Sequence, residues 1–402
     1  MAFVASTYAL GYSAARKSLF SYMLKVVERA CDITDNTEED NWTLLQALAV
    51  LYAYPEVVIK SKNGQKQQLN LWRVKSAVET CAMQQSLHHS VEHLRALARS
   101  RELEIFTSLA YRRTFYWLWL FVKSRHHSIM TRTPPTIQND TTITSTVDLL
   151  LELSPSPKVW RILAETALHR VWDQAAIRDK GLSEWWCLPS STKDIGSLQV
   201  LLENAEAMLQ EWESTWLQSG EAVTNSFLDF GAPTEPHIAS SITTFMGLLT
   251  RFNIISFAAP IISRQLVAKT GSGSFSPSST LSLELSSFLN CMLRSADTAS
   301  KCCDSIIDLK PAAREFLRYT PDYGFTMIAL CCLHLVCAYN MSPHNLTLKE
   351  YLGKAEQVAH LMMELGEIPI SIQFHLLIIV TIPGASRMGR YWKQLQVKEI
   401  CS

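Results

Sequence analysis

The sequence predicts an all-α protein, a large multi-helix regulatory domain with long helices and loops rich in Pro, Gly and Ser. Two observations predict this class: apolar residues recur at steps of three and four along most of the chain, and alternating strand patterns are scarce. The composition is a third observation, because 48% of the 402 residues are hydrophobic and 18% are charged. That is enough apolar material for a large core.

The expected helices follow one another along the chain. The segment 41–54 is apolar around most of its circumference, as an interior helix is, whereas 71–89 and 198–218 each carry one apolar stripe. Periodicity predicts helices over 41–54, 71–89, 101–130, 158–178, 198–218, 238–268, 281–309, 325–340 and 348–365. Loops are expected over 131–157, which has four prolines, over 220–236, and over the Gly/Ser-rich 269–280.

The segment 112–137, RRTFYWLWLFVKSRHHSIMTRTPPTI, raises the question of a membrane anchor, a ligand site or a buried helix. Its longest uncharged run is nine residues, shorter than the roughly 18–20 residues that span a bilayer. Apolar residues at steps of three and four extend through it, and its middle is apolar on all sides. We therefore expect the core of a buried helix, in which Arg112 and Arg113 extend to solvent or pair with carboxylates.

Charge and cysteine usage narrow the function classes. Lys+Arg and Asp+Glu number 37 each, so the chain lacks the basic excess of a nucleic-acid-binding surface. The ten cysteines include no C-x2-C, and most lie among alanines and leucines, which favours free buried thiols in a reducing compartment. The first residues lack the basic region of a secretory signal. We expect a soluble intracellular protein without a membrane span.

No catalytic or metal-binding constellation is found. His89 and His93 have a spacing that can bind a metal, but Ser90 stands where the zinc-protease pattern needs glutamate. Cys331, His334 and Cys337 share one face of an apolar helix, which is typical of a packed core. No Walker loop, dinucleotide loop, G-x-S-x-G elbow or aspartate-rich motif occurs. We expect no enzyme activity, no cofactor and no metal.

Residues 111–137 also have a specific order. An arginine pair is followed by an aromatic cluster, Arg-x-x-Ser, and proline before an aliphatic residue. This order resembles the signature segment of the fungal transcription-factor regulatory domain, the middle homology region of zinc-cluster regulators. The matching residues, which the resemblance marks as a structural signature, are Arg112, Arg113, Trp117, Arg125, Ser128 and Pro134. The sequence departs from the family pattern at Ser124 (usually Asp), Arg132 (usually Gly) and Thr133 (usually Arg).

Three further stretches resemble the same family in the expected order. They are NWTLLQALAVLYAYP, AMQQSLHHS, in which Ser86 stands for the family's glycine, and FLRYTPDYGFTMIALCCLHLV. The matches extend over about 45–336. They imply a helical lead-in over 1–40, the regulatory domain over 41–340 and a C-terminal helical segment over 341–402.

The resemblance implies a nuclear transcriptional regulator of fungal genes, for example those of secondary metabolism or nutrient use. It implies action through protein partners, with a dimer among the candidates, or through a bound small-molecule effector. The family's zinc cluster is not found in this sequence, so direct DNA contact is not expected. Either the chain is a stand-alone regulatory domain or the module is missing from it. The alternatives are an all-α metabolic enzyme with an unrecognised site, or a decoy that dimerises with a full-length relative.

Overall fold

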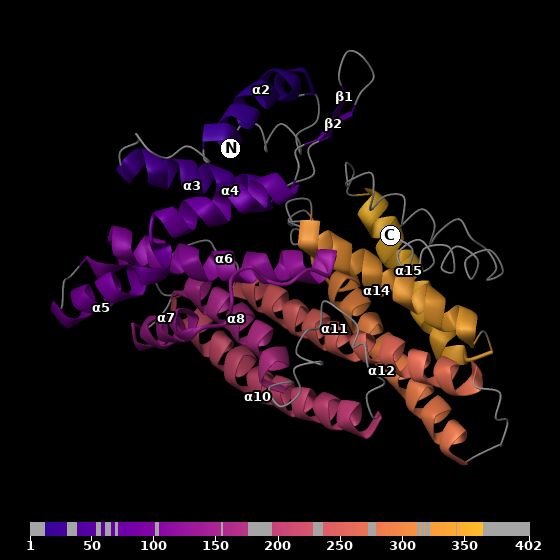
Figure 1. Cartoon of the computed structure of the whole chain (residues 1–402). Helices are drawn as coiled ribbons and strands as arrows, with labels where there is room; N and C mark the ends of the chain where they lie inside the picture. Colours follow the sequence, from indigo (N-terminus) through magenta and orange to yellow (C-terminus); the bar gives the residue numbers. More distant parts are fainter. Residues whose placement is uncertain are drawn as a thin grey trace. The chain divides into compact units, whose positions relative to one another are not determined.

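The structure is a computed structural model, shown in Figure 1. It describes residues 13–29, 38–53, 58–60, 66–68, 71–100, 104–153, 156–175, 195–227, 236–271, 279–311, 314, 317, 322–342 and 344–364.

The described part of the chain is almost entirely helical, which confirms the predicted all-α class. Its α-helices are α2 (Ser13–Arg29), α3 (Glu38–Ala53), α4 (Leu71–Gln84), α5 (Ser90–Ser100), α6 (Leu109–Thr131), α7 (Thr141–Glu152), α8 (Pro157–Ala175), α10 (Ile195–Phe227), α11 (Pro236–Gly271), α12 (Ser279–Ile307), α14 (Asp322–Met341) and α15 (Leu346–Glu364). Two 3-10 turns, η1 (Leu87–His89) and η2 (Ile105–Thr107), precede α5 and α6. A short antiparallel hairpin joins β1 (Val58–Lys60) to β2 (Lys66–Gln68).

The chain forms two compact units. Unit 1 comprises Met1–Thr131, Pro135–Thr166 and Tyr319–Tyr323, and unit 2 comprises Arg132–Pro134, Ala167–Arg318 and Gly324–Ser402. The boundaries expected at residues 40 and 340 follow from the family resemblance and remain predictions.

In unit 1, the aromatic helix α6 is the centre of the core. Tyr116 donates a hydrogen bond of 2.9 Å to the Leu45 carbonyl of α3, and its ring packs edge-on against Trp42 at 5.5 Å. Thr114 donates to Ser90 of α5 at 3.1 Å. Buried aromatic rings with satisfied polar groups stabilise a core strongly. The predicted buried helix is therefore confirmed.

Helix α6 begins later than predicted. Its N-cap is Ser108, which has an extended backbone (φ −60°, ψ 150°) and whose Oγ accepts a hydrogen bond from the Tyr111 amide at 3.1 Å. A serine in this conformation starts a helix rather than continuing one. The expected start at residue 101 was wrong because the apolar period continues through η2, where Phe106 is half exposed.

Helix α7 lies inside the segment that we predicted to be a loop. Its N-cap is Asp140, whose Oδ1 accepts hydrogen bonds from the amides of Thr142 (2.9 Å) and Ile143 (3.2 Å). Ile143 and Leu150 are buried on one side of the helix. The flanking prolines and the threonines hid this helix, because β-branched residues lower helix propensity without forbidding a packed helix.

Two other predicted boundaries were wrong. The helix expected over 71–89 ends at Gln84, because Ser86 takes a left-handed conformation with φ 53°. Helix α10 continues to Phe227, into the interruption predicted over 220–236.

Unit 2 is built from long helices, of which α11 lies between α10 and α12 (Figure 1), and α15 packs on α12. The packing of α10 against α11 is tight at Gly247, where a Cβ would lie 2.8 Å from the Trp212 ring. Glycine is needed at position 247 because only a hydrogen atom fits against the Trp212 ring there.

Helix α14 is joined to α12 by a polar contact, since His334 of α14 shares a hydrogen bond of 2.7 Å with Ser295 of α12.

All cysteines in the described part of the chain are free, and six of the seven are buried, as predicted. Cys303 of α12 and Cys332 of α14 approach to 4.0 Å between their sulfur atoms. Cys31, Cys187 and Cys401 lie outside the described residues.

Two stretches among the described helices, Ile242–Ile262 and Tyr323–Met341, are long and apolar enough to cross a membrane by length and composition. The sequence predicted no membrane span, but an average over 18 residues tolerates single polar residues such as His334. Each window is 56% buried inside the protein, as core helices are. Length and hydropathy alone are weak evidence for a membrane span.

Candidate functional site

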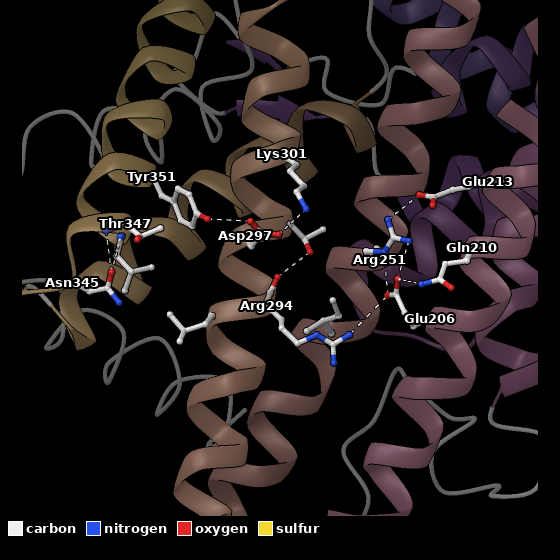
Figure 2. A pocket seen from close by; sticks show the side chains of 14 residues that line it. Glu206, Gln210, Glu213, Arg251, Arg294, Asp297, Lys301, Asn345, Thr347 and Tyr351 are labelled. Carbon is white, nitrogen blue, oxygen red and sulfur yellow. Dashed lines mark hydrogen bonds and ion pairs between the residues drawn. The ribbon is translucent and has the colours of Figure 1, made fainter. Parts of the chain in front are cut away.

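The candidate site is a hollow in unit 2 with a volume of about 760 Å³, open to solvent on one side. Helices α10, α11, α12 and α15 supply its walls (Figure 2). Its charged residues are Glu206, Glu213, Arg251, Arg294, Asp297 and Lys301. Three acidic and three basic side chains therefore meet there, together with Tyr351 and the aliphatic Leu293.

Arg251 of α11 is held between two carboxylates of α10, as Figure 2 shows. Its Nη1 donates to Glu213 Oε1 at 2.9 Å and its Nε donates to Glu206 Oε2 at 3.2 Å. Burial alone would lower the pKa of Arg251, but the hydrogen bonds to Glu213 and Glu206 outweigh it and raise the pKa. Arg294 of α12 approaches the same Glu206 at 3.9 Å. The guanidinium of Arg251 therefore remains charged and in a fixed position.

Asp297 of α12 links the hollow to α15. It accepts a hydrogen bond from the Tyr351 hydroxyl at 3.0 Å and forms an ion pair of 2.8 Å with Lys301. Burial alone would raise the pKa of Asp297, but the hydrogen bonds from Lys301 and Tyr351 and the charges of Lys301 and Lys354 lower it. Burial and the hydrogen bond to Asp297 raise the pKa of Tyr351 to about 12. The carboxylate remains ionised and the phenol remains protonated at neutral pH.

These interactions limit what the hollow does chemically. General acid–base catalysis needs a group that titrates near the working pH and can reach a substrate. The shifts of Asp297, Tyr351 and Arg251 all move their pKa values away from neutrality. Because the charges are paired and the hollow is open, its geometry suits the docking of a partner better than the enclosure of a small molecule.

The first half of the sequence signature lies on α6 in unit 1. Arg112 is exposed, and Arg113 is half-buried and donates to Gln85 Oε1 at 3.5 Å. Trp117 is buried, and its Nε1 donates to Thr142 Oγ1 of α7 at 3.3 Å. Arg113 and Trp117 therefore connect α6 to its neighbours within unit 1.

The second half of the signature ends α6 and enters the next loop. Arg125 is buried with its guanidinium over the Phe121 ring, 5.2 Å from the centroid. Ser128 is also buried, whereas Pro134 is exposed. No signature residue lines the hollow.

Ser124, which stands where the family has aspartate, takes part in a polar network. Its Oγ lies 2.9 Å from Thr136 Oγ1 in the loop after α6. Thr136 in turn donates to Glu79 Oε1 at 2.6 Å and accepts from Lys75 Nζ at 2.7 Å. Lys75 and Glu79 form an ion pair of 3.0 Å on α4. A serine hydroxyl thus joins the end of α6 to the loop and, through Thr136, to α4.

His127 is a buried polar group beside this network. It is 1% exposed, and neither ring nitrogen has a hydrogen-bond partner in the described part of the chain. Its ring meets Trp72 at a right angle, with 4.6 Å between centroids, and lies 6.1 Å from Tyr52. Burial and the positive charge of Lys75 lower the pKa of His127 to about 4.

Neither the pair His89 and His93 nor the group Cys331, His334 and Cys337 belongs to a metal-binding cluster among the described residues. His89 lies 3.3 Å from Glu92 on the surface, and His93 is exposed. Cys331 is buried, Cys337 is half-buried, and burial lowers the pKa of His334 to about 4. Among the described residues, no three His, Cys, Asp or Glu side chains are placed to hold a metal ion.

Sequence reasoning missed the hollow. Its residues come from four separate helices, and no short stretch of sequence includes residues from more than one of these helices. The one available signal was the unusual charge of 195–227, which has five glutamates and no Lys, Arg or His.

We compared the chain with protein-family models, with curated proteins and with solved structures, and none of the three comparisons gave a match.

Proposed function

We propose that this protein is a transcriptional regulator of fungal genes that acts through its helical domain and protein partners rather than by direct contact with DNA. The order of residues in 112–137 and the three accompanying stretches support this proposal through their resemblance to the fungal regulatory domain. The balanced charge supports the absence of DNA contact, since phosphate binding needs Lys and Arg in excess.

The observation that carries the proposal concerns two backbone positions. Ser86 and Arg132 are the non-glycine residues with positive φ in the described part of the chain, at 53° and 50°. They are also the two positions at which the resemblance expects glycine. Left-handed backbone costs an L-residue about 1–2 kcal/mol and costs glycine little. The backbone conformation therefore favours glycine at the two positions where the family pattern has glycine. This agreement supports the match between the sequence and the family pattern.

The hollow of unit 2 supports action by docking. It is open, its charges are mutually paired, and the pKa shifts of Asp297, Tyr351 and Arg251 lead away from neutrality. These properties favour a binding surface over a catalytic site.

Two measurements test the proposal. A fluorescently tagged full chain is expected to accumulate in the nucleus of the fungus that expresses it, and exclusion from the nucleus would contradict the regulatory role. In a mobility-shift assay, the purified full chain is expected to give no sequence-specific shift with promoter DNA at physiological salt. A tight, sequence-specific shift would contradict the indirect mode of action.

A further inference from the structure

Four cysteines lie close together between α12 and α14 of unit 2. Cys302 and Cys303 are consecutive on α12, and Cys331 and Cys332 are consecutive on α14. All four are free, and each is exposed by 2% or less. The sulfur atoms of Cys303 and Cys332 approach to 4.0 Å. Neither the hollow nor the sequence signature contains any of these residues.

The four thiol groups influence one another's ionisation. The contact with Cys303 raises the pKa of Cys332 well above its usual value, and burial raises it further. Burial raises the pKa of Cys331 well above its usual value, with added effects from Cys302, Cys303 and Cys332. Cys331 and Cys332 therefore remain protonated at neutral pH, and they are poor nucleophiles while the two helices stay packed.

The pair Cys303 and Cys332 needs little movement to become linked. A disulfide bond is about 2.05 Å long, so the two sulfur atoms must approach by about 2 Å. Rotation of each side chain about its Cα–Cβ bond, together with a small shift of the helices, supplies a movement of this size. Packing alone does not require the sulfur atoms of two helices to face one another, since cysteine packs as a small hydrophobic residue.

We propose that Cys303 and Cys332 form a reversible disulfide that clamps α12 to α14 when the protein meets a peroxide. In a reducing compartment the thiols stay free, and disulfides that do form there are usually transient and redox-sensing. Because both thiols are buried, the oxidant reaches them when the contact between the two helices opens locally. The disulfide therefore forms only when an oxidant and such an opening coincide. This inference goes beyond the proposed regulatory role and does not depend on it.

The reaction balances with hydrogen peroxide as the oxidant. One thiol loses its proton, its sulfur attacks a peroxide oxygen, the O–O bond breaks, and the departing hydroxide takes up the proton as water. The second thiol then attacks the resulting sulfenic acid, the S–S bond forms, the S–O bond breaks, and a second water leaves. The two sulfurs together lose two electrons, which the peroxide accepts. A dithiol reductant reverses the reaction by thiol–disulfide exchange.

The test uses the full chain, which is reduced with dithiothreitol, freed of it and treated with hydrogen peroxide. Tandem mass spectrometry of its peptides is expected to show Cys303 linked to Cys332, and fresh dithiothreitol is expected to restore both thiols. The bond joins residues 29 positions apart in the chain. Oxidation is therefore expected to raise the midpoint of thermal unfolding by roughly 5 °C, measured after the peroxide is removed.

Three variants make the assignment specific. The link and the rise in the unfolding midpoint are expected to be lost in Cys303→Ala and in Cys332→Ala. The matched control is Cys291→Ala, which removes another buried, free thiol of α12 and is expected to keep the link. Circular dichroism checks that each variant is folded, and if an alanine variant does not fold, the peptides of the wild type decide alone.

Three outcomes would overturn the inference. If peroxide links the pair in urea but leaves both thiols free in the folded chain, burial makes the pair inert. A link between Cys302 and Cys331, or oxidation to sulfinic acid without a link, would contradict the assigned pair. A Cys303–Cys332 link that leaves the unfolding midpoint unchanged or lowers it would contradict a clamp.

Discussion

At the scale of single residues, the backbone at Ser86 and Arg132 is the feature most open to test. Both residues have left-handed conformations, and the Ser86 side chain makes no capping hydrogen bond at the turn that starts η1. Each side chain therefore adds backbone strain, and the turn geometry at each position would suit glycine better.

We predict that Ser86→Gly and Arg132→Gly each increase the free energy of unfolding by about 0.5–1.5 kcal/mol, because relief of the left-handed strain exceeds the added entropy of the unfolded chain. Urea denaturation followed by circular dichroism measures the change. Ala207→Gly on the exposed side of α10 is the control and is expected to lower stability by about 1 kcal/mol. Destabilisation by all three substitutions would show that the two turns do not favour glycine.

His127 gives the protein a specific dependence on pH. Its pKa of about 4 in the folded protein lies below the ordinary value of 6.5 that applies to the unfolded chain. The stabilisation by the neutral ring is therefore complete above pH 6.5 and is lost as pH falls toward 4. His334, with a pKa also near 4, contributes in the same direction.

We predict that the loss of stability between pH 7.5 and pH 5 is smaller in His127→Phe than in the wild type, by roughly 1 kcal/mol after allowance for solvent screening. Phenylalanine keeps an aromatic ring against Trp72 but cannot take up a proton. Thermal unfolding at the two pH values measures the difference. An identical loss in both proteins would mean that His127 does not titrate differently in the folded and unfolded states.

At the scale of elements, apolar periodicity was a good guide to where the helices of the described chain lie and a poor guide to where they end. The periodic pattern of α6 was visible in the sequence, but its start depends on the local conformation of Ser108. Helix α7 was missed because its cap at Asp140 and its buried Ile143 lie among threonines and prolines. Packing and capping decide such cases, and a one-dimensional pattern does not contain them.

Two glycines inside helices of unit 2 provide a matched pair of substitutions. At Gly247 an added Cβ would meet the Trp212 ring at 2.8 Å, whereas at Gly353 of α15 nothing lies within 4 Å. We predict that Gly247→Ala destabilises the protein by about 1–3 kcal/mol, because the contact of α10 with α11 must open.

Gly353→Ala is expected to stabilise the protein by about 0.5–1 kcal/mol, because alanine favours the helix and meets no obstacle. Urea denaturation of both variants measures the two effects. Equal and positive effects would indicate that the Trp212 ring moves aside at little cost.

At the scale of the whole molecule, the sequence led to the fold class but not to the candidate site. The hollow depends on Glu206, Arg251, Asp297 and Tyr351, which belong to four helices and come together only through packing. The sequence signature of 112–137, in contrast, is local and could be found by its order alone. In the structure its α6 residues contact neighbouring elements of unit 1, and no signature residue lines the hollow. The signature is thus the basis of the proposed family resemblance, and the hollow had to be found from the structure.

Transcript profiling after deletion of the gene, with the wild-type gene returned as the control, tests the proposed regulatory role. We expect a defined set of transcripts to change in the deletion strain and the wild-type gene to restore it. Unchanged transcripts together with an accumulated metabolic intermediate would contradict the regulatory role and would indicate an all-α enzyme instead.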